Sequence, residues 1–172
     1  GDIYSDDHVT LSGDGARFDA DTAYLGKNSQ TIDYNIVADH FGKKTESLIT
    51  VNGALTDSAK KVFRGTIDFK KGSADSVGSE NETVLMLGDD VVNKTVPLIL
   101  CAEENVEGTH GATIGELDAD TMFYFESRGI DRETAEKIMA YAAVERLIHM
   151  AEDSEFAAEV EKAMGIKTDT EE

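Results

Sequence analysis

The sequence is poor in the residues that build disulfides and metal cages: it has one cysteine, one proline and no tryptophan in 172 residues. The single cysteine, Cys101, excludes a disulfide framework within one chain and a metal site made of cysteines alone. It favours a reducing compartment, so we expect a cytoplasmic protein. No signal-peptide pattern is present, and the longest apolar run, residues 96–102, is far shorter than the ~20 residues of a membrane span.

Basic residues are also scarce, with 16 lysines and arginines against 35 acids and a net charge of -19. Such a surface repels phosphate backbones, which excludes nucleic acid as a natural partner. Residues 101–172 carry 19 of the acids and 6 of the bases, a net charge of -13. This concentration is compatible with simple solubility and with a docking face for a basic partner.

Motifs for common enzyme chemistry are missing. The segment Gly42-Lys43-Lys44-Thr45 resembles a phosphate loop but lacks the preceding glycine of a Walker A motif. There is no Gly-x-Ser-x-Gly elbow and no His-Glu-x-x-His pair. We therefore expect a protein that does not hydrolyse nucleotides by itself and is not an enzyme.

Short strands separated by turns are predicted before residue 115. Apolar residues at a spacing of two occur at Ile32, Tyr34 and Ile36 and again over residues 63–69, and the run at 95–101 predicts the last clear strand. Turns are predicted at residues 13–15, 26–28, 52–53, 71–73 and 88–90. Because no helical pattern separates the strands, an antiparallel sandwich and a β-solenoid both remain possible.

Helical spacing begins after residue 115. Asp118 and Asp131 are suitable N-caps for two helices, the first ending near Arg128 with Gly129 as its stop. A third helix is predicted from Ser154 to Met164, ended by Gly165 and followed by a frayed tail at 168–172. The inward-facing residues are predicted to be Ala135, Ile138, Met139, Ala142 and Leu147 on the second helix, and Phe156 and Val160 on the third. We expect two domains, a β domain at 1–114 and a helical domain at 115–172.

Four potential metal ligands lie within ten positions: Cys101, Glu103, Glu104 and His110. Thiolate, carboxylate and imidazole can bind zinc or iron, although this spacing matches no standard zinc finger, and Cys101 also fits a buried strand residue. His110 stands between Gly108 and Gly111, which predicts an exposed turn suited to ligation or to a subunit contact. His40 is predicted to be an ordinary turn residue.

Residues 109–139, THGATIGELDADTMFYFESRGIDRETAEKIM, closely resemble the hallmark segment of the SufB/SufD family of iron–sulfur cluster assembly proteins. The family pattern is Ser-His-Gly-Ala-Thr-(Val/Ile)-Gly, then an acid, Leu-Phe-Tyr and Ser-Arg-Gly-Ile. Weaker support, in the same order along the chain, comes from His40 with Ser47, from FRGTIDF at residues 63–69, from Asp75 and from Pro97. The resemblance covers roughly residues 30 to 150.

The resemblance implies a right-handed parallel β-helix core followed by a C-terminal helical domain. It implies a scaffold for nascent Fe–S clusters that works with an ABC-type ATPase, SufC, and pairs as a homodimer or as a SufB/SufD-type heterodimer. The ATPase would dock on the helical domain, around Phe123, Tyr124, Arg128, Gly129 and Ile130. His110 would serve a subunit contact where a transient cluster or metal is held. The resemblance does not extend to Cys101, which stands where the family usually has an apolar residue, so Cys101 and Glu104 are candidate ligands by residue type and position alone.

The chain departs from the family at several positions. The family's cysteine before Ser-His-Gly is Gly108 here, and the catalytic-type cysteine of SufB has no visible counterpart. The chain is also much shorter than typical members, so a short paralogue and the C-terminal portion of a longer member are both possible. Three functions stay open: a cluster scaffold subunit, a structural or regulatory paralogue that docks the ATPase without binding a cluster, and a β-helix hydrolase that uses His110.

Overall fold

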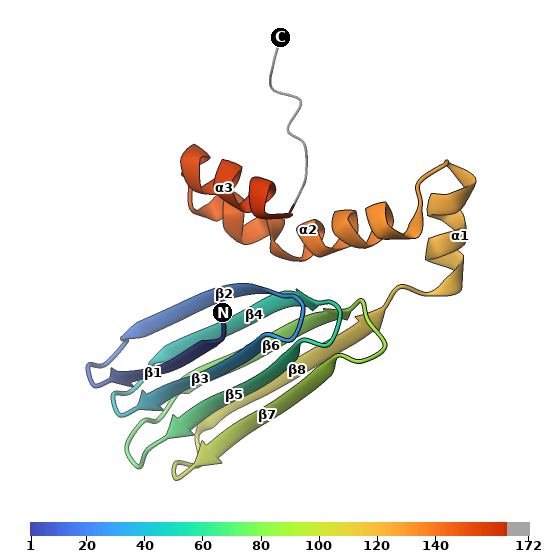
Figure 1. The fold of residues 1–172 in the computed structure, drawn as a ribbon. Helices are drawn as coiled ribbons and strands as arrows, with labels where there is room; N and C mark the ends of the chain where they lie inside the picture. Colours follow the sequence, from blue (N-terminus) through green and yellow to red (C-terminus); the bar gives the residue numbers. More distant parts are fainter. Residues whose placement is uncertain (165–172) are drawn as a thin grey trace.

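The computed structural model describes residues 1–164, which form a parallel β-solenoid followed by three helices (Figure 1). The strands are β1 (Ile3–Leu11), β2 (Arg17–Gly26), β3 (Thr31–His40), β4 (Glu46–Leu55), β5 (Lys60–Phe69), β6 (Ser76–Met86), β7 (Val92–Cys101) and β8 (Val106–Glu116). The helices are α1 (Ala119–Ser127), α2 (Arg132–Met150) and α3 (Ser154–Met164).

Successive strands alternate between two parallel sheets, ordered β1-β3-β5-β7 and β2-β4-β6-β8. One turn of the solenoid therefore contains one strand from each sheet. Ile3 pairs with Ile32, an advance of 29 residues, and Lys60 pairs with Val92, an advance of 32. The unequal advance explains why no strict repeat is visible in the sequence. The predicted β-helix with C-terminal helices is confirmed, and the antiparallel sandwich is excluded.

The core lies between the two sheets and is filled by alternate residues of each strand. In β5, Phe63, Ile67 and Phe69 point inward, as their spacing of two predicts. The other buried members of this core are Tyr24, Ile32, Ile36, Ala38, Ile49, Val51, Leu55, Ala59 and Val84. Because an inward residue meets inward residues of the facing sheet and of adjacent turns, large and small side chains must complement one another.

Stacked polar turns join the strands at the predicted glycine-rich sites, with one exception. The backbone N–H of Asn28 donates to Asp57 of the next turn over 2.7 Å, and both residues have positive φ. The exception is the predicted turn at 52–53, which is wrong because these residues lie inside β4. Position 53 needs a glycine because the Tyr24 ring leaves no room for a side chain: a Cβ atom would come within 2.5 Å of the ring.

The three predicted helices are confirmed. Asp118 and Asp131 accept hydrogen bonds from the backbone N–H of Thr121 and Thr134, and Gly129 has the positive φ of a helix stop. Gly165 and the predicted tail at 168–172 lie outside the described residues. None of these three helices is long and apolar enough to cross a membrane.

The predicted inward face of α2 is only partly right, because α2 buries Ala135 together with Ala140, Val144 and Ile148. The last three pack on Ala54, on the outer surface of the sheet that contains β2, β4 and β6. Aliphatic residues occur around much of α2, so their spacing does not determine which face of the helix is buried. The buried face is the one that packs on the apolar patch on the outer surface of the sheet.

Candidate functional site at the last turn of the solenoid

His110 lies at the middle of β8, so its predicted place on a turn is wrong. The flanking glycines suggested a turn, but Gly108 has another role: a Cβ atom there would come within 2.7 Å of Ile99 on β7. His110 pairs in register with Glu80 of β6, whose side chain is buried. Adjacent residues in register share a face of the sheet, so His110 belongs to the inward row of β8.

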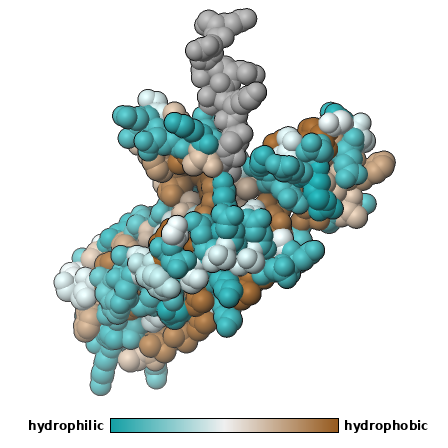
Figure 2. Space-filling model, viewed as in Figure 1, coloured by the Kyte–Doolittle hydropathy of each residue, from teal (hydrophilic) through white to brown (hydrophobic). Residues whose placement is uncertain are grey.

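His110 is nevertheless exposed, because β7 and β8 form the last turn among the described residues. Within residues 1–164, each of these strands pairs with one neighbour only: β7 with β5, and β8 with β6. The outward row of β7 is also exposed and apolar, with Val96, Leu98 and Leu100 each more than two-fifths exposed. Figure 2 shows hydrophobic residues along this lower edge of the solenoid. An unpaired edge with apolar neighbours is suited to pairing with another chain.

The other two candidate ligands lie at the neighbouring turn. Cys101 ends β7 and is exposed, so its interpretation as a buried strand residue is wrong; the end position of β7 leaves it uncovered. Glu104 follows in the turn and is exposed. His110 is four residues beyond Val106, where β8 begins, which places it about 13 Å along the strand from that turn. The structure therefore does not bring the three residues together.

Glu103, the fourth residue of the sequence cluster, has a structural role. Its carboxylate accepts a hydrogen bond from the backbone N–H of Gly72 in the preceding turn, over 2.9 Å. Backbone N–H groups, first that of Gly72 and then that of Glu104, lower the pKa of Glu103. Within residues 1–164, no three His, Cys, Asp or Glu side chains are arranged to hold a metal ion.

His40 is a buried core residue, so its prediction as a turn residue is wrong. It ends β3, and its Nδ1 and Nε2 atoms lie 2.7 Å and 2.9 Å from the hydroxyl oxygens of Thr45 and Ser47. Its ring packs on Phe69, with 4.7 Å between the ring centroids. Burial lowers the pKa of His40, which favours the neutral imidazole.

A buried polar cluster inside the solenoid was missed by the sequence analysis. Lys61 of β5 forms an ion pair with Glu82 of β6, and both side chains are almost completely buried. Thr95 donates to the second oxygen of Glu82 over 2.5 Å and accepts from Lys61 over 3.3 Å. Lys61 lies two residues before Phe63 in the alternating pattern of β5, so its side chain points into the core as those of Phe63, Ile67 and Phe69 do.

Glu80 belongs to the same interior and is 2% exposed. Its carboxylate occupies the space above Gly65, where a Cβ atom would lie 2.1 Å from Oε2, and Oε2 has no hydrogen-bond partner within the described chain. Burial, and next the charge of Glu82, raise the pKa of Glu80 to about 7, although Lys61 acts in the opposite direction. Below about pH 7 the protonated form of Glu80 therefore predominates, one strand away from His110.

The residues predicted to contact an ATPase lie on α1 and in the loop that follows it, and α1 stands apart from the solenoid in Figure 1. Phe123 is 72% exposed and Tyr124 is 53% exposed. The guanidinium of Arg128 lies over the Tyr124 ring, 4.4 Å from its centroid. Gly129 ends α1 with a positive φ, and the backbone N–H of Ile130 donates to Phe125 over 3.1 Å.

The sequence of this solenoid and its helices matches a family model described as "SUF system FeS cluster assembly, SufBD core domain" over residues 1–143. The chain belongs to the SufB/SufD family. The resemblance of residues 109–139 to this family is thereby confirmed, and the SufBD core domain takes in both the solenoid and the beginning of the helical region.

Curated members of the SufB/SufD family from different lineages are similar to the chain. It is 33% identical over 141 residues to the iron-sulfur cluster assembly protein SufD of Bacillus subtilis (strain 168), covering 82% of the chain and 32% of the relative. It is 28% identical over 159 residues to the chloroplastic SufBD family protein ABCI8 of Arabidopsis thaliana, covering 92% and 28%. Against SufD of Escherichia coli (strain K12), identity is 27% over 111 residues, covering 64% and 26%. The chain spans about a third or less of the length of these relatives.

Proposed function

We propose that the chain acts as a scaffold subunit in the assembly of iron–sulfur clusters, together with an ABC-type ATPase of the SufC kind. Membership of the SufB/SufD family supports the process. The observation that supports the scaffold role is the open last turn, where His110 and an apolar strand edge are exposed together. The cluster is the cargo of this process.

The subunit arrangement follows from the supply of ligands. Thiolates are the usual holders of Fe–S iron, and the described chain has one cysteine, which lies away from His110. The residues present therefore do not make a cluster site within one chain. A partner strand that added to β7 or β8 would bring its own side chains beside His110, in a homodimer or a SufB/SufD-type heterodimer. A neutral imidazole binds iron and releases it on protonation, which suits a transient site.

Replacing His110 by alanine should reduce the iron bound after anaerobic reconstitution of the complex with its partner subunit. The unfolding free energy should change by no more than about 0.5 kcal/mol, because an exposed side chain buries little area. Iron content per complex and thermal unfolding measure the two effects. His149→Ala, which removes an exposed histidine from α2, is the matched control and should retain the iron.

Two results would contradict this role of His110: equal iron in the variant and the wild type, or no iron in the wild-type complex. The second would favour the alternative, a structural or regulatory paralogue that docks the ATPase without holding a cluster. The absence of a gathered ligand set within residues 1–164 is the observation that keeps this alternative in view. A hydrolase site would need carboxylates near His110, and the inward carboxylate paired in register with it, that of Glu80, is buried.

The ATPase contact is proposed to lie on α1 and the start of α2. Phe123 and Tyr124 are large apolar side chains in solvent, and aromatic residues with arginine are enriched at the centres of protein interfaces. Because the guanidinium of Arg128 lies over the Tyr124 ring, the surface presents a cation and aromatic side chains together.

The double substitution Phe123→Ala and Tyr124→Ala should weaken binding of the cognate ATPase at least about tenfold, a loss typical of central aromatic contacts. Folding should be little affected, since both side chains are exposed. Binding can be measured by titration calorimetry. Tyr4→Ala, which removes an exposed aromatic residue from β1, should bind as the wild type does; equal binding by all three proteins would refute the proposed surface.

A further inference from the structure

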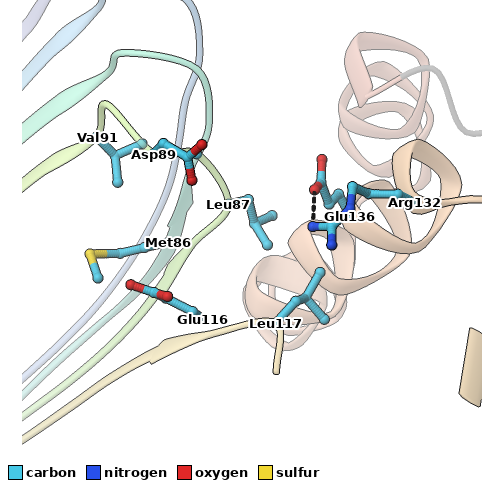
Figure 3. Close-up of a pocket in the computed structure, with 9 residues that line it drawn as sticks. Met86, Leu87, Asp89, Val91, Glu116, Leu117, Arg132 and Glu136 are labelled. Atoms are coloured by element: carbon cyan, nitrogen blue, oxygen red, sulfur yellow. Dashed lines mark ion pairs between the residues drawn. The ribbon is translucent and has the colours of Figure 1, made fainter. Parts of the chain in front are cut away.

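A cleft of about 610 Å³ separates the solenoid from the beginning of α2 (Figure 3). Figure 3 shows Asp89, Val91 and Met86 on the side of the solenoid, Arg132 and Glu136 on α2, and Leu117 near the helix. Three parts of the chain meet here: the turn after β6, the end of β8 and the first turns of α2. The lining residues are Met86, Leu87, Gly88, Asp89, Val91, Glu116, Leu117, Arg132 and Glu136.

The cleft combines apolar side chains with unpaired negative charge. Met86, Leu87, Val91 and Leu117 are partly buried and give it apolar walls. The single cation of the lining, Arg132, forms an ion pair with Glu136 at 3.5 Å.

The other two carboxylates, those of Asp89 and Glu116, form no side-chain hydrogen bond or ion pair within residues 1–164 and are exposed. With Asp89, Glu116 and Glu136 negative and Arg132 positive, the lining has a net charge of -2.

We propose that this cleft accepts an arginine or lysine side chain, flanked by apolar residues, from a partner protein. The aliphatic stem of such a side chain would lie on Leu87 and Leu117, and its cation would lie between Asp89 and Glu116. The inference goes beyond the proposed function, because it concerns the chemistry of a bound segment, whichever partner carries that segment.

Charge complementarity selects this occupant over the two that the chain itself could supply. Residues 165–172 contain one lysine against one aspartate and two glutamates, so the negative cleft repels this segment. A second copy of the chain has a net charge of -19 and is repelled in the same way. A basic segment is attracted both by the cleft and by the surrounding region, since residues 101–172 have a net charge of -13.

The test uses a fluorescently labelled, amidated peptide of alternating leucine and arginine, and a matched peptide in which uncharged citrulline replaces arginine. Fluorescence anisotropy with the whole chain should show at least about tenfold tighter binding of the arginine peptide. The double variant Asp89→Asn and Glu116→Gln should bind the arginine peptide about tenfold more weakly, since two ion pairs are lost.

Two further variants make the test specific to the cleft. Asp90→Asn with Glu107→Gln removes the same charge from exposed positions outside the lining and should change binding less than about twofold. Arg132→Ala frees Glu136 and should tighten binding about threefold.

Equal weakening by the two double variants would show binding to general negative charge and would overturn the proposal. Equal binding of the two peptides would also overturn it. So would a fraction of bound peptide that rises in step with self-association of the chain, as measured by sedimentation. None of these outcomes depends on the α1 surface, so failure of the ATPase contact is detected separately.

Discussion

Replacing Lys61 by methionine should destabilise the fold by about 3–5 kcal/mol, because one partner of a buried ion pair is removed and the other is left behind. Lys61 and Glu82 are almost completely buried. Without the lysine, the carboxylate of Glu82 would keep only the hydrogen bond from Thr95 among the partners it has in the described part of the chain. Folded domains are typically stable by about 5–15 kcal/mol, so the loss is a large part of the total. Urea denaturation at neutral pH measures it.

A second substitution separates charge from packing. Adding Glu82→Met to Lys61→Met should recover most of the lost stability, because two apolar side chains of similar size often replace a buried ion pair without loss. Lys94→Met, on the exposed side of β7, is the control and should change the unfolding free energy by about 0.5 kcal/mol or less. A double variant no more stable than Lys61→Met would show that the pair is needed for its shape and polarity together.

The stability of the solenoid should fall as the pH rises through neutrality, because burial favours the protonated form of Glu80 over the ionised form. Its pKa is raised from 4.5 to about 7 in the fold. The stabilisation from the protonated acid is fully present below pH 4.5 and is lost as the pH rises through 7, an overall loss of about 3 kcal/mol. About 2 kcal/mol of this loss should fall between pH 5.5 and pH 8.

Glu80→Gln isolates this contribution, since glutamine is a neutral side chain of nearly the same shape. The difference in unfolding free energy between variant and wild type should move by about 2 kcal/mol in favour of the variant between pH 5.5 and pH 8. His40 is present in both proteins, so its contribution to the pH dependence cancels in this difference. That contribution has the opposite sign, because the lowered pKa of His40 removes stability as the pH falls below 6.5. Glu107→Gln, at an exposed site on β8, is the control; a difference independent of pH for Glu80→Gln would contradict the burial of an acid proton.

The sequence predicted those parts of the fold that depend on local rules. Spacing of two identified β3 and β5, and the caps Asp118 and Asp131 located α1 and α2, because each of these signals depends on residues a few positions apart. The parallel arrangement came from the family resemblance. Spacing alone left a sandwich possible, since pairs of strands 29 residues apart leave no local mark.

The candidate site was harder to predict because its features depend on contacts between turns of the solenoid. Gly108 and Gly111 predict a turn around His110 when only neighbouring residues are considered. In the fold, position 108 needs a glycine because the side chain of Ile99, on another strand, leaves no room for a Cβ atom. Lys61 and Glu82 are charged, and charged residues of strands usually face the solvent. They are buried because they occupy those alternate positions of β5 and β6 whose side chains point into the core. Extending the alternation of residues 63–69 back by two residues would have placed Lys61 inside.

The single-sided pairing of β7 and β8 makes the alignment of any added strand decisive. A strand joined to β8 must present its inward residues in step with His110, because a shift of one residue turns every side chain of that strand to the opposite face. The same shift would exchange the groups that reach His110 for those that reach the solvent. Two partners of equal affinity for this edge could therefore place entirely different side chains beside the imidazole. The chemistry at His110 would then depend on which partner binds and in which register.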